Sequence, residues 1–239
     1  MISRMIQPYG LEENIGIHVL ISNVFWWLSI SLVIVAYKHR KMWNIDRVTW
    51  ILLFLTFLFF GIRELGHLSN SLIIGSIRHI FGIWSATFMT FTFISLYEIL
   101  YKRKKSSGIK IHVPLALALI FPVLVFVLYF SGIQETGLKN TLSGLESLAW
   151  IFGSIITIFT TYRLGTHAIG GFVNVFMFFQ FAAYSALLWK LLGFLGTIGY
   201  PAPYYIRESI ETLFGLFGLV AIYLLLKMLR GLSHKLSRD

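Results

Sequence analysis

The sequence predicts an all-α, polytopic integral membrane protein: a bundle of seven transmembrane helices in a single domain, residues 1–239. Two observations support this prediction. Hydrophobic residues make up 57% of the chain and charged residues only 13%, whereas soluble domains carry about 25% charged residues. The apolar residues form continuous runs of the length that a helix needs to cross roughly 30 Å of hydrocarbon. The chain contains no Cys, which excludes disulfides, thiolate metal sites and cysteine nucleophiles.

The apolar runs define the expected helices. Each run is about 20 residues long, which fits a transmembrane helix and not the roughly 10-residue alternating strand of a membrane barrel. The loops between the runs are short, so no soluble domain of useful size fits between the helices. The expected spans are 15–37, 48–67, 72–101, 113–130, 143–162, 172–195 and 206–230.

Charge in the loops predicts the orientation. The N-terminal segment MISRMIQPYGLEENIG is polar and acidic, so we expect no signal peptide and a first helix that stays as an anchor. Lys and Arg concentrate in the loops after the first, third, fifth and seventh spans, most densely at Lys102–Lys105. The positive-inside rule then places the N-terminus outside and the C-terminus in the cytoplasm of a multi-pass cell-membrane protein. The net charge of +10 is thus expected to face anionic lipids at the cytoplasmic face, not nucleic acid.

Ionisable residues gather at one level of the expected bundle, near the outer ends of the spans. A charge inside a bilayer costs about 2.5–3.5 kcal/mol on insertion scales, so such groups need partners or a function. The members of this layer are His18, Arg63, Glu64, His67, Arg78, His79, Glu146, Lys190, Arg207, Glu208 and Glu211. We expect these side chains to meet in one pocket just below the outer headgroups.

Span length draws two of these carboxylates into the membrane. The apolar part of the fifth span, 148–162, is too short to cross by itself, so its helix must include Glu146. The apolar part of the seventh span begins at Leu213, so Glu211 belongs to that helix for the same reason.

A metal site is one interpretation of the layer. Glu64 and His67 are three residues apart, as are Glu208 and Glu211, so each pair shares a helix face. A Glu-x-x-His pair on a bundle helix, joined by acids from neighbouring helices, is typical of carboxylate metal sites. The candidate metal ligands are Glu64, His67, His79, Glu146, Glu208 and Glu211. Their oxygen and nitrogen atoms suit a divalent Zn, Mn or Fe ion.

Two other interpretations remain open. The layer holds equal numbers of permanently basic and acidic side chains, so it can balance its own charge as a structural ion network. Alternatively, its basic residues hold an organic or anionic ligand. The candidate ligand-binding residues are Arg63, Arg78, Lys190 and Arg207.

The histidines argue against a haem. His18, His67 and His79 share the outer level, and two of them on facing helices could bind an iron axially. The remaining histidines lie in expected loops or near the ends of the chain: His39, His112, His167 and His234. A haem-bearing bundle should place its histidine pairs deeper.

A track of small polar residues runs inward from the layer. The third span carries Ser85 and Thr92, and the fifth carries Ser154, Thr157, Thr160 and Thr161. Such hydroxyls most often bond to their own helix or join neighbouring helices. The alternative is the wall of a hydrated path or a proton relay.

Tryptophans near span ends are expected to be interfacial. Tryptophan is enriched where hydrocarbon meets the headgroups. The residues concerned are Trp43, Trp50, Trp150 and Trp189.

No family signature accompanies this pattern. The only Lys in the seventh span is Lys227, at its cytoplasmic end, which excludes a retinal Schiff base. The zinc-protease motif HExxH and the Gly-x-Ser-Gly motif are absent, and no span contains an Asp.

Three classes of function fit these observations. The first is a protein whose outer polar site binds a metal ion or small polar solute for transport or permeation. The second is a membrane-embedded, metal-dependent hydrolase, in which a metal activates water and a Glu acts as general base. The third is a non-catalytic sensor or assembly subunit with a structural ion cluster, which needs a partner membrane protein or a second copy of the chain.

Overall fold

The computed structural model describes residues 15–40, 45–68, 72–100, 108–130, 135–197, 199–200 and 202–236. These residues form seven α-helices, one 3-10 turn and no strand, which confirms the all-α class. The helices are α2 (Ile15–Lys38), α3 (Arg47–Leu65), α4 (Leu72–Leu100), α5 (Gly108–Phe130), α6 (Glu135–His167), α7 (Phe172–Thr197) and α8 (Tyr204–Leu236), and the 3-10 turn η2 is Gly66–Leu68.

Five helices are long and apolar enough to cross a membrane. The segments that meet this criterion are Arg47–Leu65, Ile73–Leu100, Asn140–His167, Phe172–Gly196 and Tyr205–His234. The described apolar segments of α2 and α5, Asn23–Lys38 and Val113–Leu128, are shorter. The chain therefore has the character of a helical membrane protein, while the seven spans, the outer N-terminus and the cytoplasmic C-terminus stay predictions.

Two helices extend well beyond their apolar runs. α6 begins at Glu135, although its expected span began at residue 143, and α8 continues to Leu236 rather than ending at residue 230. Half of the residues in these two extensions are Glu, Lys or Leu, which are strong helix formers. Glu146 and Glu211 consequently lie inside helices, as the span-length argument predicted.

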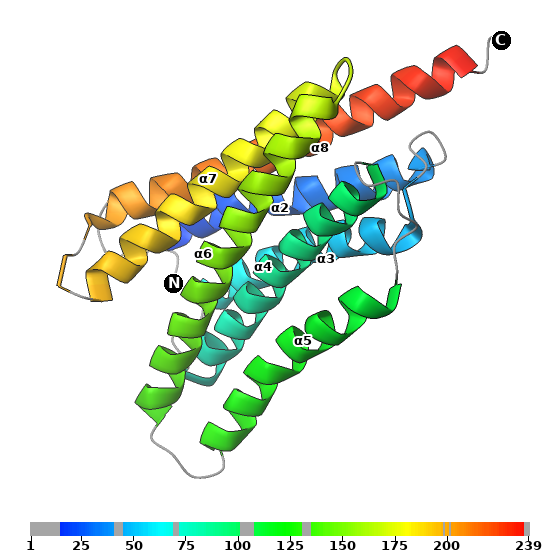
Figure 1. Cartoon of the computed structure of the whole chain (residues 1–239). Coiled ribbons are helices and arrows are strands. Elements are labelled where there is room, and N and C mark those ends of the chain that lie inside the picture. The colour runs from blue at the N-terminus through cyan, green and yellow to red at the C-terminus, as the bar shows by residue number, and fades with distance from the viewer. Residues whose placement is uncertain are drawn as a thin grey trace.

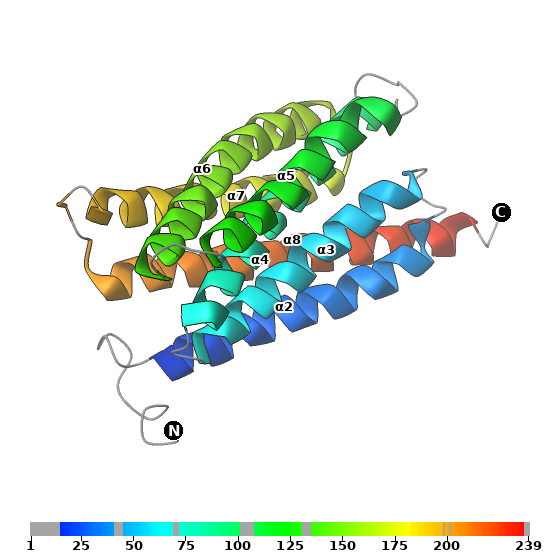
Figure 2. The same cartoon turned by 90° about the horizontal axis from the view of Figure 1, so that it is seen from below.

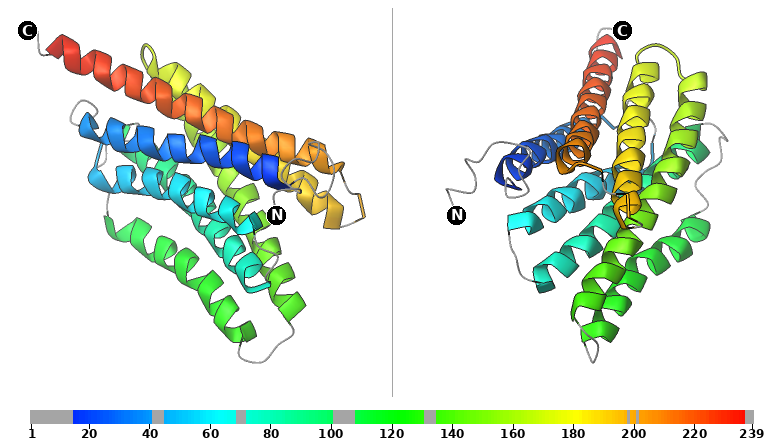
Figure 3. Two further views of the ribbon diagram at one scale, coloured as in Figure 1. Left: turned by 180° about the vertical axis from the view of Figure 1, so that it is seen from behind. Right: turned by 90° about the vertical axis from the view of Figure 1, so that its left-hand side faces the viewer.

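Six of the helices form a closed ring. α2 packs against α3 and α8, and the ring continues through contacts of α3 with α4, α4 with α6, α6 with α7 and α7 with α8. α5 lies outside the ring and, among the described helices, contacts only α4 and α6. Figures 1 and 2 show this arrangement, and Figure 3 shows α2 alongside α8 with α5 at the opposite side of the bundle.

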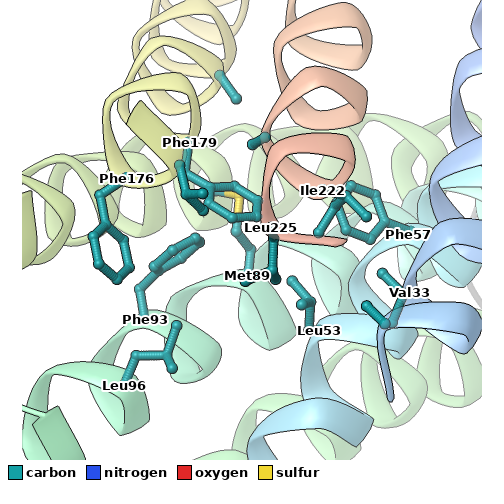
Figure 4. Packing of buried hydrophobic residues seen from close by; sticks show 14 of the residues in the cluster. Val33, Leu53, Phe57, Met89, Phe93, Leu96, Phe176, Phe179, Ile222 and Leu225 are labelled. Carbon is teal, nitrogen blue, oxygen red and sulfur yellow. The ribbon is translucent and has the colours of Figure 1, made fainter. Parts of the chain in front are cut away.

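The ring encloses a continuous apolar core. Figure 4 shows part of it, where Phe93 of α4 and Phe179 of α7 meet with their ring centroids 4.9 Å apart. The outer surface is also apolar: Leu117 and Leu128 of α5 are 64% and 65% exposed. A helical bundle that is apolar both inside and outside is suited to lipid, because lipid tails solvate such a surface and water does not.

The end of α3 remote from the ionic residues is fixed by a polar cap. Asp46 is the N-cap, and its side chain accepts a hydrogen bond of 3.0 Å from the backbone N–H of Thr49. The hydroxyl of Thr49 also lies 2.6 Å from the hydroxyl of Ser95 on α4. These contacts join α3 to α4 at this end.

Candidate functional site

The ionic residues meet where α3 ends and α4 begins. We call the ionic cluster the six residues Arg63, Glu64, His79, Glu146, Lys190 and Glu211, which come from α3, α4, α6, α7 and α8. Each is between 0% and 7% exposed. Five helices that are distant in sequence therefore place their charged groups in one buried position.

Arg63 is the centre of the cluster. Its Nε donates to Glu146 Oε1 over 2.8 Å, and its Nη1 donates to Glu211 Oε1 over 2.8 Å and also to Glu64. One guanidinium thus joins α3, α6 and α8. A planar guanidinium suits this role because its five N–H donors have fixed directions and stay charged when buried.

Glu146 is the second branch point. Besides Arg63, its Oε1 accepts a hydrogen bond of 2.7 Å from Lys190 Nζ, and its Oε2 lies 2.5 Å from His79 Nδ1. Glu146 thereby links α6 to α3, α4 and α7.

Gly82 makes room for the Glu146 carboxylate. A Cβ at this position of α4 would lie 2.5 Å from both the carboxyl carbon and Oε1 of Glu146. Gly82 follows His79 by three residues, so both belong to the face of α4 that meets α6. The sequence His79-x-x-Gly82 therefore supplies both a partner and the space for this acid.

The members of the cluster depend on one another electrostatically. An isolated charge in a dry interior is costly, and removal of one partner from a buried ion pair destabilises a protein by about 3–5 kcal/mol. Arg63 and Lys190 offset two of the three negative charges of Glu64, Glu146 and Glu211, and His79 gives Glu146 a further hydrogen-bond partner.

A cavity of about 240 Å³ lies beside the cluster. It is lined by Arg63, His67, Arg78, His79, Ser143, Glu146, Ser147, Trp189, Lys190, Gly193, Arg207, Glu208 and Glu211. Four of these side chains are permanently basic and three are acidic, whereas Glu64 is not part of the wall. The wall therefore carries more positive than negative charge.

The two remaining arginines of the wall are held less tightly than Arg63. Arg78 Nη1 lies 2.8 Å from His67 Nδ1, and no carboxylate of the described side chains forms an ion pair with it. Arg207 lies 3.5 Å from Glu208, and its side chain is 38% exposed. The Nε of Arg78 is buried and has no hydrogen-bond partner among the described residues, so it can donate to a ligand in the cavity.

The arrangement does not support the metal prediction. Arg63 occupies the position among Glu64, Glu146 and Glu211 that a bound cation would need, while His67 turns to Arg78 and Glu208 to Arg207. Across the described residues, no group of three or more His, Cys, Asp or Glu side chains is arranged to hold a metal ion. The side chain of His18 lies outside the described side chains.

A layer of aromatic side chains, the aromatic layer, packs against the ionic cluster on the side toward the middle of the helices, away from the end of the bundle where the cavity lies. The Arg63 guanidinium carbon lies 4.8 Å from the ring centre of Trp189 and 5.1 Å from that of Phe60. Phe60 also packs edge-on against Trp150 and Phe214, with ring centroids 5.4 Å and 5.2 Å apart. Trp26 of α2 completes the layer, 4.3 Å from Phe60.

The burial of these tryptophans corrects the interfacial interpretation. Trp150 is 0% exposed, Trp189 4% and Trp50 3%, so their rings face the protein core and not the headgroups. Trp43 lies outside the described residues. Position near a span end indicates the depth of a residue but not the direction in which its ring points.

Most of the polar track bonds to backbone. Ser85 donates to the carbonyl of Thr56 on α3, and Thr92 donates to its own helix at Phe88. Thr160 and Thr161 likewise donate to carbonyls of α6. These four hydroxyls therefore bond to helix backbone, as most buried hydroxyls do. Ser154 and Thr157 differ, because their hydroxyls have no hydrogen-bond partner among the described residues.

Comparisons of the chain with protein-family models, curated proteins and solved structures gave no match.

Proposed function

We propose that this chain is an integral membrane protein that binds a small anionic solute, of the carboxylate or phosphate class, in the cavity beside the ionic cluster. The observation that carries the proposal is Arg78, which lines the cavity and has no ion pair with a described carboxylate. Arg63 and Lys190, by contrast, are committed to glutamates.

The distribution of acids favours an anionic ligand over a cationic one. Of the three acids in the wall, Glu146 and Glu211 are bonded to Arg63, and Glu208 lies 3.5 Å from Arg207. A cation entering the cavity would have to compete with an arginine for each of these carboxylates. An anion would instead meet Arg78 and Arg207, whose planar groups can bind a carboxylate or phosphate through two parallel hydrogen bonds.

The size and polarity of the cavity suit a small solute. A volume of about 240 Å³ corresponds to about eight water molecules at roughly 30 Å³ each. The hydroxyl groups of Ser143 and Ser147 also line it and can donate to oxygen atoms of a ligand.

The predicted topology places this cavity at the outer side of the membrane. Capture of the solute there is then the first step of its permeation. The aromatic layer lies between the cavity and the opposite end of the bundle, so passage of a solute requires that layer to open.

Thermal unfolding with added anions tests the proposal. Sodium phosphate and sodium acetate, added at constant ionic strength to the purified protein, should raise the midpoint because a ligand that binds only the folded state stabilises it. The Arg78→Gln variant should lose this increase. Arg163→Gln, which removes an exposed arginine near the other end of α6, should retain it. An equal response in wild type and Arg78→Gln would contradict the proposal.

A structural role for the cluster is the second candidate. It is favoured by the contacts of Arg63 with three carboxylates, which lock α3, α6 and α8 together. In that case neither anion should change the unfolding midpoint of the wild type, while Glu146→Gln should still lower it. That outcome would leave a sensor or assembly subunit as the best account.

A further inference from the structure

We propose that α6 holds a chain of bound water molecules that runs from Glu146 past the aromatic layer to Thr157. The proposal concerns the interior of the helix ring and does not depend on which solute the cavity binds.

The first observation is a polar stripe on one face of α6. Glu146, Trp150, Ser154 and Thr157 follow one another at intervals of four, four and three residues, and all four are 0% exposed. At about 1.5 Å of rise per residue, successive members are separated by about 4.5–6 Å along the helix axis. One water molecule with two hydrogen bonds of about 2.8 Å spans about 4.5 Å, so one or two water molecules cover each interval along the helix.

The second observation is that three of these residues have unpartnered polar atoms. Trp150 Nε1, Ser154 Oγ and Thr157 Oγ1 are buried and have no hydrogen-bond partner in the described part of the chain. Buried polar atoms in proteins are nearly always hydrogen-bonded, either to protein or to ordered water. Three such residues lie on one face of α6, and ordered water is the partner small enough to reach their buried polar atoms.

Other side chains of the same kinds have protein partners. Thr160 and Thr161 of the same helix donate to backbone carbonyls, as buried threonines commonly do. The indole of Trp84 donates to the carbonyl of Leu119 over 3.0 Å, and that of Trp27 donates to Asn23 over 3.1 Å. The indole N–H of Trp150 has no such acceptor among the described residues.

The chain of water would extend the polar region through an otherwise apolar layer. Trp150 belongs to the aromatic layer, since its ring lies 5.4 Å from Phe60 and 5.1 Å from Phe214. Glu146 lies on the cavity side of that layer, and Ser154 and Thr157 follow Trp150 further along α6. Water along this face connects the ionic cluster to the middle of the bundle by hydrogen bonds, although a larger solute cannot pass.

Radiolytic hydroxyl-radical labelling tests this proposal. X-ray pulses generate hydroxyl radicals from bound water, and these oxidise a buried side chain only if water lies next to it. In the protein reconstituted in lipid nanodiscs, Trp150 should be oxidised several-fold faster than Trp26. Trp26 is an internal reference, because it is 1% exposed and belongs to the same aromatic layer.

Two matched variants identify the water partners. Thr157→Val keeps the side-chain shape but removes the hydroxyl, so it should slow the oxidation of Trp150. Thr160→Val should leave the rate unchanged, because the Thr160 hydroxyl already bonds to its own helix. The proposal is overturned if Trp150 is oxidised as slowly as Trp26, or if Thr157→Val and Thr160→Val have the same effect. The unfolding midpoint gives an independent readout. Thr157→Val should lower it if water binds the Thr157 hydroxyl, whereas an increase would indicate a dry core and contradict the proposal.

Discussion

A single guanidinium determines the charge balance of the interior. Arg63 is 4% exposed and contacts Glu64, Glu146 and Glu211 from three helices. Its contacts with these three acids offset the cost of burying its charge. Each acid depends on it in return, which makes this arginine the most sensitive position of the cluster.

Replacement of Arg63 by Met should therefore destabilise the protein severely. We expect a loss of about 3–5 kcal/mol in the free energy of unfolding, because uncompensated carboxylates stay buried. Arg163→Met, at an exposed site, should change it by about 0.5 kcal/mol or less. Denaturant titration of both variants in the same detergent measures the difference.

A double variant separates charge from packing at this position. Addition of Glu211→Gln to Arg63→Met removes one uncompensated acid, so the two substitutions together should cost less than the sum of their separate effects. Strict additivity would show that Arg63 and Glu211 are not coupled, contrary to their 2.8 Å contact.

At the scale of helices, the α4–α6 interface is built around one small residue. Gly82 of α4 faces the carboxylate of Glu146, and any side chain there would collide with it. Elsewhere a glycine in a helix interior is a liability, because alanine stabilises a helix by about 0.5–1 kcal/mol relative to glycine. The sign of the change in the free energy of unfolding after a Gly→Ala substitution thus shows whether the two helices are closely packed at that position.

Gly82→Ala and Gly144→Ala should have opposite effects. Gly82→Ala should destabilise the protein by about 1–3 kcal/mol, as overpacking does. Gly144→Ala, on α6, meets no atom within 4 Å and should be neutral or stabilising. Unfolding midpoints of the two variants test this, and a neutral Gly82→Ala would show that the Glu146 carboxylate shifts away from α4 without cost.

The helices could be predicted from the sequence, but the partners of the charged residues could not. Continuous apolar runs define where a helix crosses lipid, and the short apolar run after Glu146 correctly placed that acid inside α6. Equal numbers of acids and bases favour an ion network over a metal site, but they do not show which base lies between the acids. Which group lies between the acids depends on how five helices pack.

The aromatic layer could not be predicted for a different reason. Helices in lipid are apolar on both their inner and outer faces, so hydrophobic periodicity does not distinguish core from surface. Trp150 and the exposed Phe152 look alike in sequence, although they are 0% and 63% exposed. Only tertiary contacts show that the tryptophan lies beneath the ionic cluster.

At the scale of the whole molecule, the predicted orientation decides which side of the membrane the cavity serves. The chain has no native Cys, so single cysteines can report the side of each loop. Tyr200, between α7 and α8, is 74% exposed, and Ile169, between α6 and α7, is 88% exposed. The basic run Lys102–Lys105, the expected contact with anionic lipid, lies outside the described residues.

Labelling of intact cells tests this topology. A membrane-impermeant maleimide should label Tyr200→Cys in intact cells and Ile169→Cys only after permeabilisation. The two positions are matched in exposure, so access to reagent and not burial determines the result. The reverse pattern would place the cavity on the cytoplasmic side.

The location of a bound anion tests the central claim most directly. Crystals of the protein grown with sodium selenate, an oxyanion with a strong anomalous signal, should show a selenium peak in the cavity within hydrogen-bonding distance of the Arg78 guanidinium. Arg63 should remain between Glu146 and Glu211 in the same map. The account would be contradicted if no selenium peak lay near Arg78, or if a transition metal lay among the glutamates in place of Arg63.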